Sequence, residues 1–286
     1  MVALIIGLNT YFGREGVKFL QDEDFNIIGL TRDAALLEKK LGIIEGAKLY
    51  SIDICQVGNK REELQLPHID ISFYFSQIPD LNDEIGINYE LLSLHNFIQL
   101  SKRNNVRRIV YFGKRYEQKY LAKILDLFKA SDVDFTLVLK DIALGEGTSF
   151  DGFINDLLKN RKIYLYKPKK KIYVRPVVLK DVYRWIRSVD WQKQYINQVI
   201  EFGGENVYEI EDIIKRYIQR KGIYSDYKIV PLRNATMAKY INMAFHNLDI
   251  ELYSEYIRQG SSTPMHDNSS WKQTTQFAFT PLEEVL

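Results

Sequence analysis

The sequence predicts an α/β protein: a doubly wound (Rossmann), mainly parallel sheet followed by a smaller C-terminal α+β lobe. Short apolar runs of strand length alternate with helix-length amphipathic patterns through the first half of the chain. The first run, 1–6, stops at a glycine and leads into a helical pattern, and the next run, 25–30, follows at the interval of a βαβ unit. Strands that read as continuous apolar runs are typical of parallel sheets covered by helices on both faces.

The later elements follow the same alternation. Up to residue 139 we expect, in order, helix 34–41, strand 47–54, strand 70–75, helix 87–103, strand 106–112, helix 115–130 and strand 135–139. Beyond Gly145 the alternation loosens, and we expect helix 150–160, strand 172–178, helix 179–189, strand 198–202, helix 207–220 and further helix within 235–259. We therefore predict a dinucleotide-binding domain, 1–145, and a smaller substrate or partner lobe, 146–286, from which about 172–202 can return to the main sheet.

Composition excludes several classes of function. The 39 basic and 37 acidic residues leave a net charge of +2, which gives no field to hold nucleic acid or an anionic membrane. No apolar stretch reaches the roughly 18 residues of a membrane span, and the N-terminus has no signal-peptide pattern. One cysteine, Cys55, excludes an internal disulfide, and the four scattered histidines give no metal site. We expect a soluble, cytoplasmic protein.

The turn from Gly7 to Gly13 joins the first strand to the first helix and is the strongest local signal. A strand that ends at glycine and restarts as a helix brings backbone N–H groups and the positive helix end to one point, which suits a phosphate. Gly7 and Gly13 fill the first and third places of the glycine fingerprint, and Thr10 stands in the middle. Its side chain can crowd a pyrophosphate or donate a hydrogen bond to it. The predicted contacts here are Gly7, Asn9, Thr10, Tyr11, Phe12 and Gly13; the alternative is an ordinary turn that binds nothing.

The ends of the next strands supply the predicted adenosine contacts. Arg32 ends the second strand where the ribose would lie and favours a 2′-phosphate, with Arg14 as a second candidate, so we predict NADP(H) in preference to NAD(H). Asp53, followed by Ile54, can accept a hydrogen bond from an adenine amino group or simply begin a turn, and both interpretations stay open. Ser76 follows the fourth strand at the edge where open α/β sheets bind ligands.

The order and spacing of several segments also carry a family resemblance. These are Leu4-Ile-Ile-Gly7 with Gly13-Arg14, Gly29-Leu-Thr-Arg32, Ser51-Ile-Asp53, 104–112, 130–137, Gly145-Glu-Gly147, 174–183 and 277–286. Together they resemble an extended or atypical short-chain dehydrogenase/reductase, the family of NAD(P)-binding epimerase- and reductase-like proteins. Within it the chain is most similar to the branch that contains the nucleotide-binding accessory subunit of respiratory complex I. The resemblance implies the Rossmann fold and a bound dinucleotide.

Two strand ends depart from that family. Active members carry a serine near the end of the fifth strand, but here the strand ends in Gly113-Lys114. The sixth strand ends in Lys140-Asp141, where relatives usually have Arg-Pro. The departure at the sixth strand weakens any carry-over of the substrate pocket from the family.

The catalytic tyrosine and lysine are also displaced. Active members place Tyr-x-x-x-Lys on the helix after the fifth strand, where tyrosine donates the proton and lysine lowers its pKa. No lysine lies four residues after Tyr116 or Tyr120, but Lys119 and Lys123 lie three residues after them. A shifted pair on one helix face is thus the alternative to a lost catalytic site.

Two functions of different class follow. The favoured hypothesis is an NADP(H)-binding protein with a degenerate catalytic site and a structural, redox-sensing or complex-associated role, with a protein partner or a homodimer possible. The alternative is an active NADPH-dependent oxidoreductase that reduces a small carbonyl or quinone-like substrate in the cleft between the lobes, with Tyr116 or Tyr120 as the acid.

Overall fold

The computed structural model describes residues 1–22, 24–41, 46–56, 64–76, 84–169, 171–189, 193–220, 227–246, 253–254, 256–258 and 277–285. They form two compact units. The first contains Met1–Leu139 and Ile186–Ile200, and the second contains Lys140–Trp185 and Glu201–Leu286.

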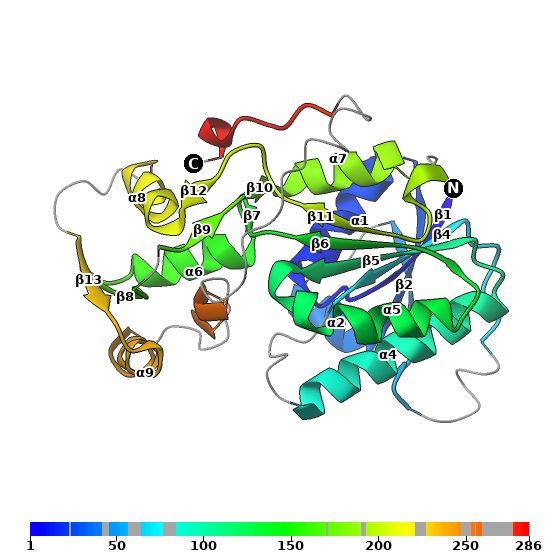
Figure 1. The fold of residues 1–286 in the computed structure, drawn as a ribbon. Helices are drawn as coiled ribbons and strands as arrows, with labels where there is room; N and C mark the ends of the chain where they lie inside the picture. The colour runs from blue at the N-terminus through cyan, green and yellow to red at the C-terminus, as the bar shows by residue number, and fades with distance from the viewer. Residues whose placement is uncertain are drawn as a thin grey trace. The chain divides into compact units, whose positions relative to one another are not determined.

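A seven-stranded sheet is the centre of the fold (Figure 1), in the order β11-β6-β5-β4-β1-β2-β3. Its strands are β1 (Val2–Ile6), β2 (Asn26–Thr31), β3 (Ala47–Ser51), β4 (Ile71–Phe75), β5 (Arg108–Lys114), β6 (Asp134–Lys140) and β11 (Gln198–Phe202). β1 pairs in parallel with β2 on one side and with β4 on the other. The strand order reverses between β1 and β4, which is where doubly wound sheets bind ligands. The predicted doubly wound parallel sheet is confirmed.

The last strand of the sheet comes from late in the sequence. β11 lies beside β6, since Asn197 N donates to Phe135 O at 2.6 Å and Asp141 N donates to Phe202 O at 3.1 Å. Partners that advance together along both strands indicate parallel pairing. The second half of the chain thus completes the sheet begun by the first.

Helices cover both faces of the sheet. In the first unit they are α1 (Tyr11–Asp22), α2 (Ala34–Leu41), α4 (Glu84–Arg103), the 3₁₀ helix η1 (Arg115–Tyr120) and α5 (Leu121–Lys129). Tyr74 meets Phe97 of α4 edge to face, with ring centroids 5.4 Å apart. The next residue, Phe75, meets Phe12 of α1 at 5.1 Å. Neighbouring strand residues point to opposite faces, so α4 and α1 lie on opposite sides of the sheet.

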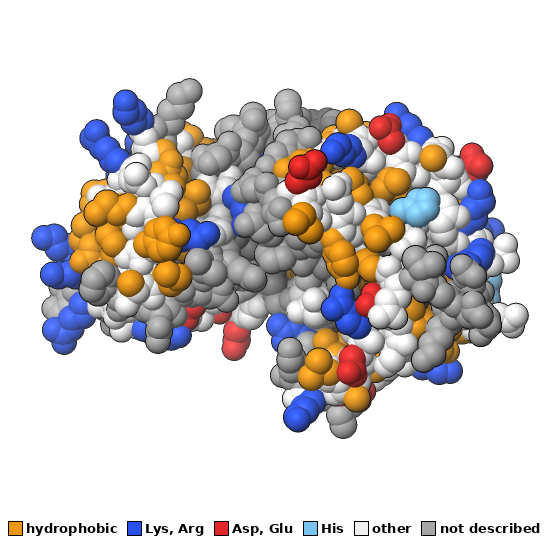
Figure 2. Space-filling model, turned by 90° about the horizontal axis from the view of Figure 1, so that it is seen from below, with side chains coloured by type: hydrophobic (Ala, Val, Ile, Leu, Met, Phe, Trp, Pro, Cys, Tyr) orange, Lys and Arg blue, Asp and Glu red, His pale blue; other side chains and the backbone are white. Residues whose placement is uncertain are grey.

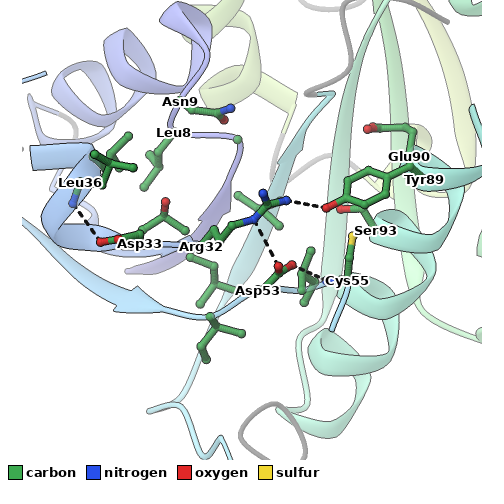
Figure 3. Close-up of a pocket in the computed structure, with 17 residues that line it drawn as sticks. Leu8, Asn9, Arg32, Asp33, Leu36, Asp53, Cys55, Tyr89, Glu90 and Ser93 are labelled. Atoms are coloured by element: carbon green, nitrogen blue, oxygen red, sulfur yellow. Dashed lines mark hydrogen bonds and ion pairs between the residues drawn. The ribbon is translucent and has the colours of Figure 1, made fainter. Parts of the chain in front are cut away.

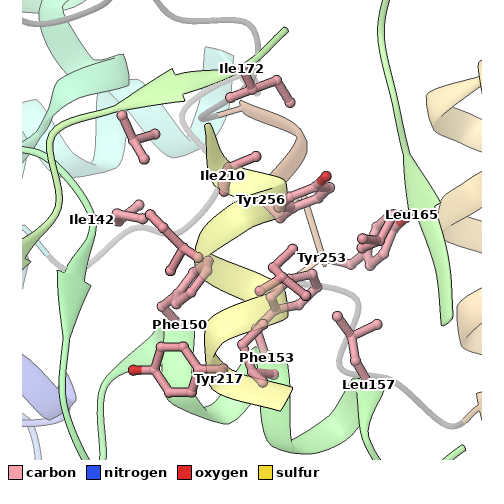
Figure 4. Packing of buried hydrophobic residues seen from close by; sticks show 14 of the residues in the cluster. Ile142, Phe150, Phe153, Leu157, Leu165, Ile172, Ile210, Tyr217, Tyr253 and Tyr256 are labelled. Carbon is pink, nitrogen blue, oxygen red and sulfur yellow. The ribbon is translucent and has the colours of Figure 1, made fainter. Parts of the chain in front are cut away.

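The second unit has its own apolar core (Figure 4), in which α6 (Ser149–Leu157) and α8 (Ile210–Arg220) pack together with residues 253–258. Two tyrosine hydroxyls bind backbone carbonyls of β8 (Lys162–Tyr166): Tyr253 donates to Tyr164 O and Tyr256 donates to Tyr166 O, both at 2.9 Å. Buried tyrosines commonly find such partners for their hydroxyls. The remaining elements are β7 (Ala143–Leu144), β9 (Tyr173–Val174), β10 (Val177–Val178), α7 (Leu179–Val189), η2 (Lys193–Tyr195), β12 (Tyr208–Glu209), β13 (Lys228–Leu232), α9 (Ala235–His246) and η3 (Leu282–Glu284).

Several predicted elements need correction. The helix expected over 115–130 begins as 3₁₀ and becomes α-helical at Leu121. The strand expected over 172–178 is two short strands, because Pro176 between them has no N–H for a ladder. The parallel strands β8 and β13 were not predicted. The part of 235–259 expected to be helical beyond His246 lies largely outside the described residues.

A buried carboxylate fixes the C-terminal segment within the second unit. Asp181 of α7 is fully buried, and its carboxylate accepts from Thr280 N at 2.8 Å and from Thr280 Oγ1 at 2.7 Å. Arg184 Nη1 lies 2.9 Å from Asp181 Oδ1. Three donors compensate the cost of burying this charge.

The surface agrees with the near-neutral composition. Figure 2 shows basic and acidic side chains scattered among hydrophobic ones on the face drawn. Within the described residues, no helix is both long and apolar enough to cross a lipid bilayer.

Candidate dinucleotide site

Glycine is required at both ends of the turn between β1 and α1. Gly7 has φ +92°, and a Cβ atom there would lie 2.5 Å from Phe75 O. A Cβ atom on Gly13 would overlap Gly7 O, so α1 can approach the strand this closely only with glycine. These are the first and third roles of the glycine fingerprint.

Thr10 caps α1. Its hydroxyl donates to Gly7 O at 2.6 Å and accepts from Gly13 N at 3.0 Å. Because a hydroxyl has a single hydrogen, the bond to Gly7 leaves none for a phosphate oxygen. The Thr10 hydroxyl is therefore a helix cap in this state, while Tyr11 and Phe12 supply N–H groups of the first turn that have no carbonyl partner within the helix.

Side chains at the start of α1 point in different directions. Phe12 is buried against Phe75 and Phe112, with ring centroids 5.1 and 5.6 Å away, so its side chain belongs to the core. Arg14 follows about 200° farther around the helix, away from β4 and β5. Its buried Nε has no hydrogen-bond partner in the described part of the chain.

A pocket of about 350 Å³ lies at the carboxyl ends of β1, β2 and β3 (Figure 3). It brings together residues that are far apart in sequence. Its lining is Ile6, Gly7, Leu8, Asn9, Leu30, Thr31, Arg32, Asp33, Leu36, Leu37, Ile52, Asp53, Ile54, Cys55, Tyr89, Glu90 and Ser93. Five of the residues predicted to contact the cofactor are among them: Gly7, Asn9, Arg32, Asp53 and Ile54.

Arg32 reaches across the mouth of this pocket. Its Nε lies 3.2 Å from Asp53 Oδ2, and its Nη2 donates to the Tyr89 hydroxyl at 2.6 Å. The arginine side chain is 69% exposed, whereas that of Asp53 is 18% exposed. The guanidinium is therefore open to solvent on the side away from these partners.

The two aspartates of the pocket both shape turns. Asp33 Oδ1 accepts from Leu36 N at 2.9 Å and caps α2. Asp53 Oδ1 accepts from Cys55 N at 3.0 Å, and Asp53 O accepts from Gln56 N at 3.1 Å. The turn-forming role of Asp53 is thus present in the structure. Contact with an adenine amino group stays a prediction.

A buried carboxyl group occupies the end of β5. Glu117 of η1 is fully buried, and its Oε2 accepts from the Tyr111 hydroxyl at 2.9 Å. A Cβ atom on Gly113 would collide with Glu117 Oε2 and lie 2.8 Å from Tyr111 Cε1. The Glu117 carboxyl therefore occupies the space that a side chain at residue 113 would need.

Burial governs the protonation of this cluster. It raises the pKa of Glu117, an effect that the hydrogen bond from Tyr111 and the nearby positive charge of Lys114 oppose. Burial also raises the pKa of Tyr111 and of Tyr74, and their rings stack with centroids 5.4 Å apart. Desolvation disfavours the charged form of every acid here.

Ser76 and the catalytic candidates lie outside the pocket. Ser76 N donates to Phe112 O at 3.0 Å. Tyr120 is half-buried and packs against Ile87, and Lys123 is exposed on α5. Tyr116 and Lys119 belong to η1, but their side chains are outside the described part.

Sequence reasoning missed the contribution of α4 to the pocket. Tyr89, Glu90 and Ser93 line it from that helix, and Cys55 is half-buried at its wall. An amphipathic pattern assigns such residues to a face but names no partner across the fold. Among the described residues no group of His, Cys, Asp or Glu is arranged to hold a metal ion.

Comparison with solved structures identifies the fold. The enzyme WbmH of Bordetella bronchiseptica, solved with NAD+, superposes with a TM-score of 0.71 at 16% identity, over 99% of this chain and 95% of its own. A nucleoside-diphosphate-sugar epimerase of Staphylococcus aureus gives 0.70 at 14% identity, over 99% and 98%. Yeast methylglyoxal/isovaleraldehyde reductase Gre2, solved with NADPH, gives 0.64 at 16% identity, over 100% and 95%. The chain has the extended short-chain dehydrogenase/reductase fold.

The similarity in sequence is weaker than the similarity in structure. No protein-family model matches the chain. A curated relative, the chloroplastic divinyl chlorophyllide a 8-vinyl-reductase of Arabidopsis thaliana, is 22% identical over an alignment of 224 residues that covers 70% of this chain. The matched region spans about half of that relative, 52% of its length. The similarity of this chain to the complex I branch of the family stays a prediction.

Proposed function

We propose that the chain binds a nicotinamide dinucleotide at the carboxyl ends of β1 to β3, NADP(H) in preference to NAD(H). The observation that carries the proposal is the pocket itself, which places Arg32 and Asp53 beside the Gly7 turn. The turn and the start of α1 would hold the pyrophosphate, and the pocket would hold the adenosine. Solved proteins of this fold contain NAD+ or NADPH.

The charges at the end of β2 favour a 2′-phosphate. Arg32 presents an exposed guanidinium, whose planar fork can bind a phosphate by two hydrogen bonds. The neighbouring carboxylate, Asp33, uses Oδ1 to cap α2, which leaves only Oδ2 for a ribose 2′-hydroxyl of the kind that NAD-specific acids bind. Arg14 is the second candidate for the phosphate.

We propose further that the catalytic site is degenerate, so that the bound nucleotide serves a structural, redox-sensing or complex-associated role. In support, the buried Glu117 carboxyl fills the space beside Gly113 that a serine side chain needs. A homodimer or a protein partner belongs to this proposal, as does a cytoplasmic location. The first unit would be the nucleotide domain, and the second would serve a substrate or partner.

Calorimetry with NADPH and NADH tests the cofactor proposal. Arg32→Ala should weaken NADPH binding by roughly 1.5–3 kcal/mol, the scale of a charge-assisted hydrogen bond, and leave NADH binding nearly unchanged. Lys48→Ala is a matched control, because Lys48 is an exposed cation on β3 that lies over the Tyr50 ring outside the pocket. Equal losses for both nucleotides would contradict the NADP(H) preference.

The second candidate is an active NADPH-dependent oxidoreductase for a small carbonyl or quinone-like substrate. The reductases among the similar proteins favour it. Replacing Tyr116 and Tyr120 together by Phe separates the two functions. A degenerate site predicts NADPH affinity and any reductase rate within a few-fold of wild type, whereas general-acid catalysis predicts a rate loss of about a hundredfold or more.

A further inference from the structure

Tyr89 connects α4 to the arginine at the end of β2. Its hydroxyl accepts from Arg32 Nη2 at 2.6 Å, although the two residues lie 57 positions apart in the chain. Tyr89 is 41% exposed, so its ring lies at the rim of the pocket (Figure 3). Tyr89 is not among the residues that the sequence predicts to contact the cofactor.

The contacts of Arg32 link Tyr89 to the end of β3. Arg32 binds Asp53 through Nε and Tyr89 through Nη2. Cys55 N donates to Asp53 Oδ1 at 3.0 Å, and interaction with the nearby Cys55 thiol raises the pKa of Tyr89. The guanidinium is therefore held at two points, by a carboxylate and by a neutral hydroxyl.

The geometry points to Tyr89 as a positioning residue that sets cofactor preference by holding Arg32 ready for the 2′-phosphate. This inference rests on the proposed function. Arg32 Nη1 has no partner in the described part of the chain, so it is available to a ligand. The tyrosine hydroxyl anchors the guanidinium without adding negative charge, which would repel a phosphate.

The expected loss of affinity in Tyr89→Phe follows from side-chain entropy. Immobilising a long side chain on binding costs about 0.5–1.5 kcal/mol, and a partner that already holds it removes part of that cost. With about 1.4 kcal/mol for each factor of ten in affinity, Tyr89→Phe should weaken a 2′-phosphorylated ligand roughly two- to tenfold. Ligands without the phosphate should be almost unaffected.

Four ligands and three variants test this. Affinities for NADPH, NADH, 2′,5′-ADP and 5′-AMP would be measured by calorimetry for wild type, Tyr89→Phe, Arg32→Ala and the double variant. Tyr240→Phe is the matched control, because Tyr240 is an exposed tyrosine of α9, outside the pocket. We expect Tyr89→Phe to weaken only NADPH and 2′,5′-ADP, and to have no further effect once Arg32 is alanine.

Each other outcome has a separate meaning. Wild-type affinity for 2′,5′-ADP in Tyr89→Phe, or additive losses in the double variant, would overturn the role of Tyr89 and leave the cofactor proposal standing. Equal weakening of all four ligands would show a merely structural contribution and would also overturn it. Wild-type protein that does not discriminate 2′,5′-ADP from 5′-AMP would overturn the NADP(H) preference, and the inference with it.

Discussion

Gly113 and Glu117 are mutually dependent, because the glutamate carboxyl lies where a side chain at residue 113 would begin. The carboxyl is fully buried and bonded to the Tyr111 hydroxyl, so it has little room to move. Placing a serine at residue 113, near the end of β5, would therefore require a change on η1 as well.

Gly113→Ser should destabilise the fold by about 1–3 kcal/mol, the usual cost of overpacking a filled core. Urea denaturation would measure it. In a Glu117→Ala background the same serine should cost clearly less, since the colliding carboxyl is gone. Equal costs in the two backgrounds would show that Glu117 is not the obstacle.

Glu117 should also make stability depend on pH. Its pKa is raised above 4.5 in the folded state, so the folded protein retains a proton that the unfolded chain releases. The contribution of the neutral carboxyl is complete below pH 4.5 and is lost as pH rises through the raised pKa. Urea midpoints from about pH 4 to 8 should fall relative to those of Glu117→Gln, which has no charge to gain. Parallel curves for the two proteins would contradict this.

Thr10→Ala should lower the free energy of unfolding by about 1 kcal/mol, within the 0.5–2 kcal/mol range typical of a lost helix cap. The reason is that Gly13 N loses the hydroxyl that accepts from it. Thr10→Ser retains that acceptor and should match wild type in thermal or urea unfolding. A serine variant as unstable as the alanine variant would show that the methyl group, not the cap, is what matters.

Asp181→Ala should release the C-terminal segment. It removes the acceptor for Thr280 N and Oγ1, and leaving buried donors without partners costs about 1–3 kcal/mol. Hydrogen exchange should show faster exchange at Thr280 and its neighbours. Asp151→Ala is a control on an exposed pair with Asn155, and it should leave exchange at Thr280 unchanged.

The sequence predicts correctly those features that depend only on neighbouring residues. The buried strands β1, β4 and β5 are continuous apolar runs, and the turn at Gly7 and Gly13 has little freedom once α1 must lie close to β1. The same local pattern places Arg32 and Asp53 at strand ends, and parallel strands bring such ends to one edge.

What the sequence did not reveal depends on partners far along the chain. β8 pairs with β13, two short strands carrying lysines and a proline, and the pairing rather than the residues makes them strands. From the sequence, Tyr89 is an ordinary residue of an amphipathic helix, and only the fold shows that it contacts Arg32. Glu117 reads as a helix surface residue, yet the 3₁₀ start of that helix accompanies its burial.

The late arrival of β11 has a consequence for synthesis. β6 is made well before β11. The elements from β7 to α7, which begin the second unit, lie between them in the chain. At about 5–20 residues per second, β6 waits for seconds with one edge open. Six of its seven residues are buried in the finished fold, and its open edge carries unpaired backbone N–H and C=O groups that can pair with another chain. Nascent chains that stop before Gln198 should therefore be the form of this protein most dependent on chaperones.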